Sequence, residues 1–217
     1  MHQGHVAGLK KLKTPVISGN VSLYNETRGV AIFPTPVVGM VGLIKNVKHH
    51  CTSAFKHSGD IVFLLGNPGD DAGLGSSEYL ELIHGKVEGS QQIDLEMEKR
   101  VQDCVIKAIE RGLLNSAHDC SDGGLAVALA ESCIQGGIGF SGNLNVKGRL
   151  DTAFFGESQS RIVVSVSPGA ARRLESLAFR FNIPVTRLGT LGGTQFNIKG
   201  HIDLPVGELH QAWWNGL

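Results

Sequence analysis

The chain has 217 residues, of which 41% are hydrophobic and 18% are charged, a composition typical of a soluble globular protein with one or two domains. Lys and Arg together number 20, as do Asp and Glu, so the formal net charge is zero. Proteins that bind nucleic acids or anionic membranes usually carry a basic excess, so we expect neither partner. No apolar run approaches the ~20 residues of a membrane span, and the first residues do not resemble a signal peptide. A cytoplasmic location is therefore expected.

The first part of the chain is predicted to contain a helix at residues 5–13 and strands at 15–18 and 34–44. A polar stretch at residues 46–59 follows, and it contains three histidines whose spacing matches no common metal signature. We interpret this stretch as a linker. The predicted domains are residues 1–58 and 59–217.

The second part alternates apolar runs and amphipathic segments. Residues 59–66 form a short apolar run bounded by glycines, which is typical of a strand buried on both faces. Asp94 can cap a helix that continues to Arg111, and Ser76 or Ser77 can cap a short one. Further helices are predicted at 124–134 and 170–181, and strands at 161–167, 183–191 and 195–200. The order predicts helices packed over a mixed sheet, without a dinucleotide-binding or P-loop motif.

The four cysteines form no CxxC pair, so neither a zinc site nor a redox dithiol is indicated. We expect buried free thiols at Cys51, Cys104, Cys120 and Cys133.

The segment "AHDCSDGGLAVALAES" has two interpretations. Gly123 and Gly124 stand at the predicted start of a helix, where backbone N–H groups can bind a phosphate. Alternatively, Ser121 or Asp122 caps the helix and the glycines only form the turn. The sequence leaves both open.

Polar residues also precede a predicted strand in "FFGESQSRIVVSV", where Glu157 to Arg161 can face a pocket or form a closing loop. In "PVISGNVSLYNET", Gly19 allows close approach to the backbone, Asn20 offers a neutral oxygen to Mg²⁺, and Ser22 can bind a phosphate or sugar hydroxyl. An Asx turn explains the same residues equally well.

These segments, with "PTPVVGMVGLI", resemble the synthetase component of the phosphoribosylformylglycinamidine synthase family, in the aminoimidazole ribonucleotide synthetase superfamily. "GNVSLYNE" is the most specific of them. The resemblance implies an α+β fold in which part of an N-type α+β domain precedes a three-layer αβα C-type domain with a mixed sheet. It also implies an ATP- and Mg²⁺-dependent ligase of purine biosynthesis that converts formylglycinamide ribonucleotide to its amidine with ammonia derived from glutamine.

By motif, the resemblance assigns ATP contact to Gly19, Mg²⁺ ligation to Asn20 and substrate contact to Ser22. Glu157, Ser158 and Gln159 resemble a substrate-binding motif of the family's first half, although here they lie in the second half and can form a non-catalytic pseudo-site. The catalytic histidines and acidic metal ligands of the family belong to its first half, so no catalytic residue is assigned, and His118 is not a substitute.

The resemblance implies several partners: the N-terminal half of the synthetase, a glutaminase subunit, a small accessory subunit and possible self-association. The chain alone is expected to be inactive. Two alternatives are a non-catalytic nucleotide-binding or assembly module that uses Gly123 and Gly124, and another superfamily enzyme such as selenophosphate synthetase or thiamine monophosphate kinase, in which "GNVSLYNE" is not expected.

Overall fold

The computed structural model describes residues 2–20, 25–32, 37–69, 73–144 and 148–216, without the side chains of residues 2–5. The chain divides into two units, Met1–Lys48 and His49–Leu217. Residues 49–58, which the sequence placed in the first domain, therefore group with the second unit. Phe55 explains this grouping, because its side chain is buried in the core of the second unit and its N–H donates to Ser132 O at 3.1 Å.

The first unit contains the helix α1 (His2–Leu12) and a small hairpin of β1 (Glu26–Thr27) and β2 (Val30–Ala31). Arg28 and Gly29 form its two-residue turn with φ values of 53° and 79°. Positive φ at both central residues is the geometry that joins two twisted antiparallel strands most closely. The helix confirms the sequence prediction, whereas the hairpin was not predicted.

The strands predicted at residues 15–18 and 34–44 are wrong as far as the structure describes them. Residues 15–18 and 37–44 adopt no regular structure, and residues 34–36 lie outside the described ranges. Apolar side chains in this segment are exposed, with Val37 at 95% and Val41 at 100%. A strand requires a neighbouring strand for its backbone hydrogen bonds. Among the described residues of the first unit, no segment supplies one.

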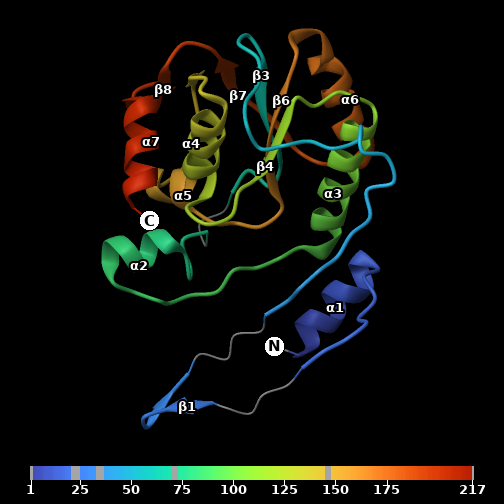
Figure 1. Ribbon diagram of the computed structural model, residues 1–217, viewed down its shortest axis with the longest axis vertical. Helices are drawn as coiled ribbons and strands as arrows, with labels where there is room; N and C mark the ends of the chain where they lie inside the picture. The colour runs from blue at the N-terminus through green and yellow to red at the C-terminus, as the bar shows by residue number, and fades with distance from the viewer. Residues whose placement is uncertain (1, 21–24, 33–36, 70–72, 145–147, 217) are drawn as a thin grey trace. The chain divides into compact units, whose positions relative to one another are not determined.

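The second unit is built on a seven-stranded sheet in the order β4-β6-β3-β7-β5-β8-β9 (Figure 1). All neighbours are antiparallel except β5 and β8, which are parallel, so the predicted mixed sheet is confirmed. The strands are β3 (Ile61–Gly66), β4 (Ser116–Asp119), β5 (Phe140–Gly142), β6 (Arg161–Val166), β7 (Val185–Leu191), β8 (Gln195–Ile198) and β9 (Ile202–Pro205).

Helices cover both faces of this sheet, which gives three layers (Figure 1). α3 and α6 pack on one face, and α4, α5 and α7 lie on the other side (Figure 1). The helices are α2 (Glu78–His84), α3 (Leu95–Glu110), α4 (Gly124–Gly136), α5 (Leu150–Phe155), α6 (Ala171–Phe181) and α7 (Val206–Asn215), with a 3₁₀ turn, η1 (Pro168–Ala170), before α6. The three-layer arrangement confirms the fold expected from the resemblance.

The inner strand β3 contributes side chains to two hydrophobic cores, one on each face of the sheet. Its six residues are all buried, and their side chains alternate between the faces. Val62 and Leu64 pack with α4, whereas Phe63 and Leu65 pack with α3 and α6. The continuous apolar run at residues 61–65 thus reflects burial on both sides, as the sequence predicted.

The best predicted helix is α3. Asp94 caps it, because its carboxylate accepts hydrogen bonds from Glu96 N at 2.8 Å and Met97 N at 3.1 Å. Val101, Cys104 and other small or apolar residues of its inward face are buried. No helix within the described ranges combines the length and hydropathy needed to cross a membrane.

All four cysteines are free thiols, and three of them are buried. Burial raises the pKa of Cys104 and Cys120 to about 11 and that of Cys133 to about 12. Burial also raises the pKa of Cys51, but this residue is only partly buried.

Iodoacetamide at pH 8 should therefore modify Cys51 first. A thiol with a pKa near 11 is only roughly 0.1% thiolate at that pH, and the thiolate is the reactive form. Mass spectrometry of tryptic peptides should show Cys104, Cys120 and Cys133 modified at least about tenfold more slowly until urea unfolds the chain. Native Cys133 reacting as fast as Cys51 would contradict the buried packing of α4.

Candidate functional site

The candidate site lies where β4 and β6 meet at one edge of the sheet. β4 runs antiparallel to β6, so that Asp119 pairs with Ile162, and Cys120 N donates to Arg161 O at 3.0 Å. The end of β4 therefore lies beside the start of β6. This pairing brings the two polar segments singled out in the sequence, residues 118–124 and 157–161, side by side.

Two glycines allow the second segment to pack against the start of α4. Gly123 and Gly124 have φ values of 74° and 69°, a region that favours glycine. A Cβ atom on Gly124 would lie 2.4 Å from Gly156 O, so a side chain there would collide with the backbone. Gly124 is thus required for the close approach of residues 155–157.

The carboxylate of Glu157 occupies the N-terminus of α4. Glu157 Oε1 accepts a hydrogen bond from Gly123 N at 2.8 Å and a second from Glu78 N at 3.0 Å. A negative charge at the N-termini of helices is favoured by the exposed N–H groups and the helix dipole. The anion site predicted at Gly123 and Gly124 is therefore filled by a side chain of the same chain.

The alternative prediction, a cap from Ser121 or Asp122, is wrong. The N-cap of α4 is Gly123, and no side chain of the cap residue bonds to the helix. A residue distant in sequence can cap a helix only if tertiary packing places its side chain at the N-terminus of the helix, as it does for Glu157.

The same carboxylate ties α2 to the site. α2 has no buried residue of its own, and its N-cap is Ser77, whose Oγ accepts from Leu80 N. Tyr79 stacks on Phe155, with ring centroids 5.0 Å apart. Glu157 and this aromatic pair therefore link α2 to the rest of the second unit.

Residues 158–160 differ in what they contact. Ser158 is buried, and its Oγ has no hydrogen-bond partner among the described residues. Gln159 is exposed and donates to Glu157 O at 3.2 Å. Ser160 has a φ of 63°, and its Oγ donates to Glu98 Oε2 at 2.7 Å, which connects the segment to α3.

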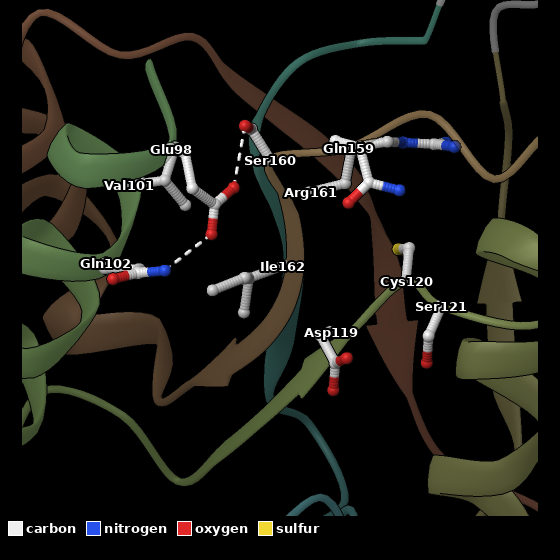
Figure 2. A pocket seen from close by; sticks show the side chains of 10 residues that line it. All are labelled: Glu98, Val101, Gln102, Asp119, Cys120, Ser121, Gln159, Ser160, Arg161 and Ile162. Carbon is white, nitrogen blue, oxygen red and sulfur yellow. Dashed lines mark hydrogen bonds between the residues drawn. The ribbon is translucent and has the colours of Figure 1, made fainter. Parts of the chain in front are cut away.

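A cavity of about 320 Å³ opens beside this segment (Figure 2). Its wall is formed by α3, the end of β4 and residues 159–162. Glu98 and Asp119 are its two acidic residues, and Glu98 also accepts from Gln102 Nε2 at 2.6 Å. Figure 2 shows the guanidinium group of Arg161 extending away from the carboxylate of Glu98.

His118 lies outside this cavity lining and contacts acidic groups. Its Nε2 is 3.1 Å from Glu131 Oε2, and its Nδ1 is 3.6 Å from Asp119 Oδ1. These contacts join β4 to α4 and indicate a structural role. The described residues contain no group of three or more His, Cys, Asp or Glu side chains placed to hold a metal ion.

The structure brings together only some of the predicted site residues. Glu157, Ser158 and Gln159 lie beside the glycine turn of α4 in the second unit. Gly19 and Asn20 belong to the first unit, where both are exposed and lie outside regular structure, and Ser22 lies outside the described residues.

The sequence assigned no part in a site to Glu98, which lines the cavity. The capping role of Glu157 has no local signal either. Arg161 was noted only as one of several polar residues, although an arginine at the first position of a strand as apolar as "IVVSV" is itself unusual.

Comparison with known proteins identifies the family. Residues 57–199 match the family described as AIR synthase related protein, C-terminal domain. Phosphoribosylformylglycinamidine synthase subunit PurL of Anaeromyxobacter sp. (strain Fw109-5) is 48% identical over 96% of the chain, and PurL of Thermomicrobium roseum is 47% identical over 99%. The chain covers 28% and 30% of these relatives, so it spans less than a third of their length.

Solved structures show the same fold. PurL of Thermotoga maritima complexed with FGAR aligns with a TM-score of 0.66 at 20% identity, over 76% of the chain and 30% of the neighbour. PurL from the same organism complexed with ATP gives a TM-score of 0.61 at 19% identity, over 76% of the chain and 28% of the neighbour. The resemblance found in the sequence is thereby confirmed. The family match covers more than half of the chain, and the PurL relatives match nearly all of it, so the chain belongs to the AIR synthase related proteins and corresponds to the C-terminal part of their PurL members.

Proposed function

We propose that the chain supplies the C-terminal part of the ligase that converts formylglycinamide ribonucleotide, ATP and ammonia derived from glutamine to formylglycinamidine ribonucleotide. In this reaction the formyl amide oxygen attacks the γ-phosphate of ATP and releases ADP. Ammonia then displaces the phosphate to give the amidine. The observation that carries the proposal is the 47–48% identity with PurL across both units of the chain.

Within this proposal, Gly19 contacts ATP, Asn20 ligates Mg²⁺ and Ser22 contacts the ribonucleotide. An amide oxygen suits Mg²⁺, but one neutral oxygen does not make a site. The described residues of this chain fit the metal only in part, so further ligands must come from elsewhere. Mg²⁺ would neutralise charge on the transferring phosphoryl group.

The proposed second contact with substrate is formed by Glu157, Ser158 and Gln159. They belong either to a functional substrate site or to a non-catalytic pseudo-site. Glu157 Oε1 already accepts two backbone N–H groups, whereas Gln159 is exposed beside the cavity. Gln159 is therefore the best placed of the three to meet a ligand. The same bond from Gly123 N to Glu157 disfavours the alternative of a nucleotide-binding module built on the glycine turn.

We also propose that the chain acts with the N-terminal part of a PurL synthetase, with a glutaminase subunit and with a small accessory subunit, in the cytoplasm. The PurLQS assembly of Thermotoga maritima, whose PurL-like chain aligns with a TM-score of 0.61, supports an assembly of this kind. The proposal also includes self-association of the isolated chain.

The purified chain should form no ADP in response to formylglycinamide ribonucleotide, with ATP, Mg²⁺ and ammonium present. The other residues that bind the metal and the substrate are expected in the N-terminal part of the synthetase. Co-expression with the N-terminal part of Thermomicrobium roseum PurL should restore substrate-dependent ADP formation. A coupled spectrophotometric assay measures both.

Asn20→Ala in the restored complex should raise the Mg²⁺ concentration needed for half-maximal rate by at least about tenfold. Loss of a residue that only orients a metal ligand already lowers metal affinity by about 10–100-fold, and Asn20 is proposed as a direct ligand. Asn25→Ala, at another exposed asparagine of the first unit, is the matched control. Activity of the chain alone would refute the inactivity of the fragment. A stable but inactive complex would refute the ligase assignment.

A further inference from the structure

Asp122 and Gly123 form an Asp–Gly pair in the turn before α4, and the sequence contains no other such pair. Asp122 is exposed, and its carboxylate has no hydrogen-bond or ion-pair partner among the described residues. In an Asp–Gly pair the backbone nitrogen of glycine can attack the preceding side-chain carboxyl group with little hindrance, because glycine has no side chain. The product of that attack is the precursor of isoaspartate. The turn therefore contains a bond that is prone to covalent rearrangement.

The fold requires the glycine of this pair. Gly123 is the N-cap of α4 and has a φ of 74°, a region that favours glycine. A Cβ atom there would also lie 2.5 Å from Cγ2 of Val127 in the first turn of the helix. Replacing Gly123 would thus remove the Asp–Gly pair only by distorting the start of α4.

The attacking nitrogen is held by Glu157. Gly123 N donates to Glu157 Oε1 at 2.8 Å. The nitrogen must lose its proton in order to attack, and a hydrogen bond to a carboxylate stabilises the N–H form. The negative charge of the carboxylate also disfavours an amide anion beside it. In the folded second unit, attack on Asp122 therefore has to wait until this bond opens locally.

We propose that the Asp122–Gly123 bond is a site of isoaspartate formation and that Glu157 suppresses the reaction while its carboxylate holds Gly123 N. In this reaction Gly123 N attacks Cγ of the protonated Asp122 side chain, and the hydroxyl group of the acid leaves with the N–H proton as water. Water then opens the resulting succinimide. Opening at the backbone carbonyl gives isoaspartate, in which the main chain runs through Cγ, and opening at Cγ restores aspartate.

Isoaspartate at this position would disturb the site described above. It lengthens the main chain by a methylene group between β4 and α4, which would move Gly123 N away from Glu157. The bond from Glu78 N to the same carboxylate would then be the remaining one of the two. The proposal goes beyond the ligase assignment, because it concerns the second unit alone and requires neither a ligand nor the other part of the synthetase.

The test is prolonged incubation of the full chain at neutral pH and physiological temperature. Isoaspartate at residue 122 is quantified over time by mass spectrometry with electron-transfer fragmentation. A synthetic peptide of residues 116–128 gives the rate without protection. The folded chain should rearrange severalfold more slowly than the peptide, and a folded chain that rearranges as fast as the peptide would overturn the proposal.

Variants separate the Glu157 bond from general stability. Glu157→Ala should raise the rate severalfold, and Glu157→Gln, which keeps an acceptor without the charge, should raise it less. The matched control is Gly137→Ala, which destabilises the other end of α4 and leaves Glu157 in place, so the rate should stay unchanged.

Three outcomes count against the protective role of Glu157. An unchanged rate in Glu157→Ala would overturn it directly. Equal acceleration in Glu157→Ala and Gly137→Ala would overturn it as well, because overall stability would then determine the rate. If Glu157→Ala fails to fold, an unchanged rate in folded Glu157→Gln would refute the proposal in its place.

Discussion

Replacing Gly124 with alanine should lower the free energy of unfolding of the second unit by at least about 3 kcal/mol. Gly124 has a φ of 69°, where a residue with a Cβ atom loses about 1–2 kcal/mol. The new methyl group would also lie 2.4 Å from Gly156 O and 2.9 Å from the carbonyl carbon of Phe155. These are backbone atoms, so relief requires α4 to separate from residues 155–157. That separation weakens the charge-assisted bond between Glu157 and Gly123, worth about 1.5–3 kcal/mol.

Urea unfolding followed by tryptophan fluorescence measures this change. The chain has two tryptophans, Trp213 and Trp214, and both lie on α7, so the signal reports the second unit. Gly137→Ala is the matched control, because Gly137 ends the same helix with a φ of 63° and has no atom within 4 Å of a Cβ atom. The control should cost only about 1 kcal/mol. Equal losses in both variants would show that backbone conformation alone, without the close approach, determines the cost.

Replacing Glu157 with alanine should destabilise the second unit by about 2–3 kcal/mol and loosen α2. The variant leaves Gly123 N and Glu78 N without their shared acceptor and removes a negative charge from two helix N-termini. Because α2 buries none of its residues, it depends on few contacts other than this carboxylate and the Tyr79–Phe155 pair. Amide hydrogen exchange in residues 78–84 should therefore accelerate at least tenfold, more than in α3.

Two further variants separate charge, shape and ligand contact at this position. Glu157→Gln keeps an acceptor oxygen and should recover roughly half of the loss, since hydrogen bonds to charged groups are about twice as strong as neutral ones. Gln159→Ala, at the neighbouring exposed side chain, should change stability by less than about 0.5 kcal/mol. If Glu157→Ala left both stability and exchange in α2 unchanged, the carboxylate would be free for a ligand and its capping role would be refuted.

Much of the second unit was predictable because its signals are local. The apolar run at 61–65 fits burial on two faces, and Asp94 caps α3 within two and three residues of its own position. Each of these patterns depends on residues close in sequence. Periodicity alone predicted only helices packed over a sheet. The three-layer arrangement was predicted from the resemblance.

The candidate site was harder to predict, because its contacts join distant segments. Glu157 bonds to Gly123 and Glu78, which are 34 and 79 residues away, and no local pattern indicates either bond. β4 was missed for a related reason. Its four residues, including His118, are mostly polar or small, and only pairing with β6 makes them a strand.

The predicted strand at residues 34–44 failed for the opposite reason. Its β-branched residues favour a strand, but this intrinsic preference gives a strand only where a neighbouring strand pairs with the backbone. Residues 15–18 also favour a strand by composition, and they too adopt no regular structure, because no described segment of the first unit pairs with them.

The exposed apolar segment of the first unit favours association between copies of the chain. Residues 37–44, "VVGMVGLI", contain neither a charge nor a proline, and the structure leaves their backbone without strand partners. A short uncharged segment of this kind readily pairs with identical copies of itself, which is the first step of cross-β aggregation. When these 217 residues are expressed alone, aggregation into inclusion bodies and binding by chaperones should therefore compete with folding of the second unit.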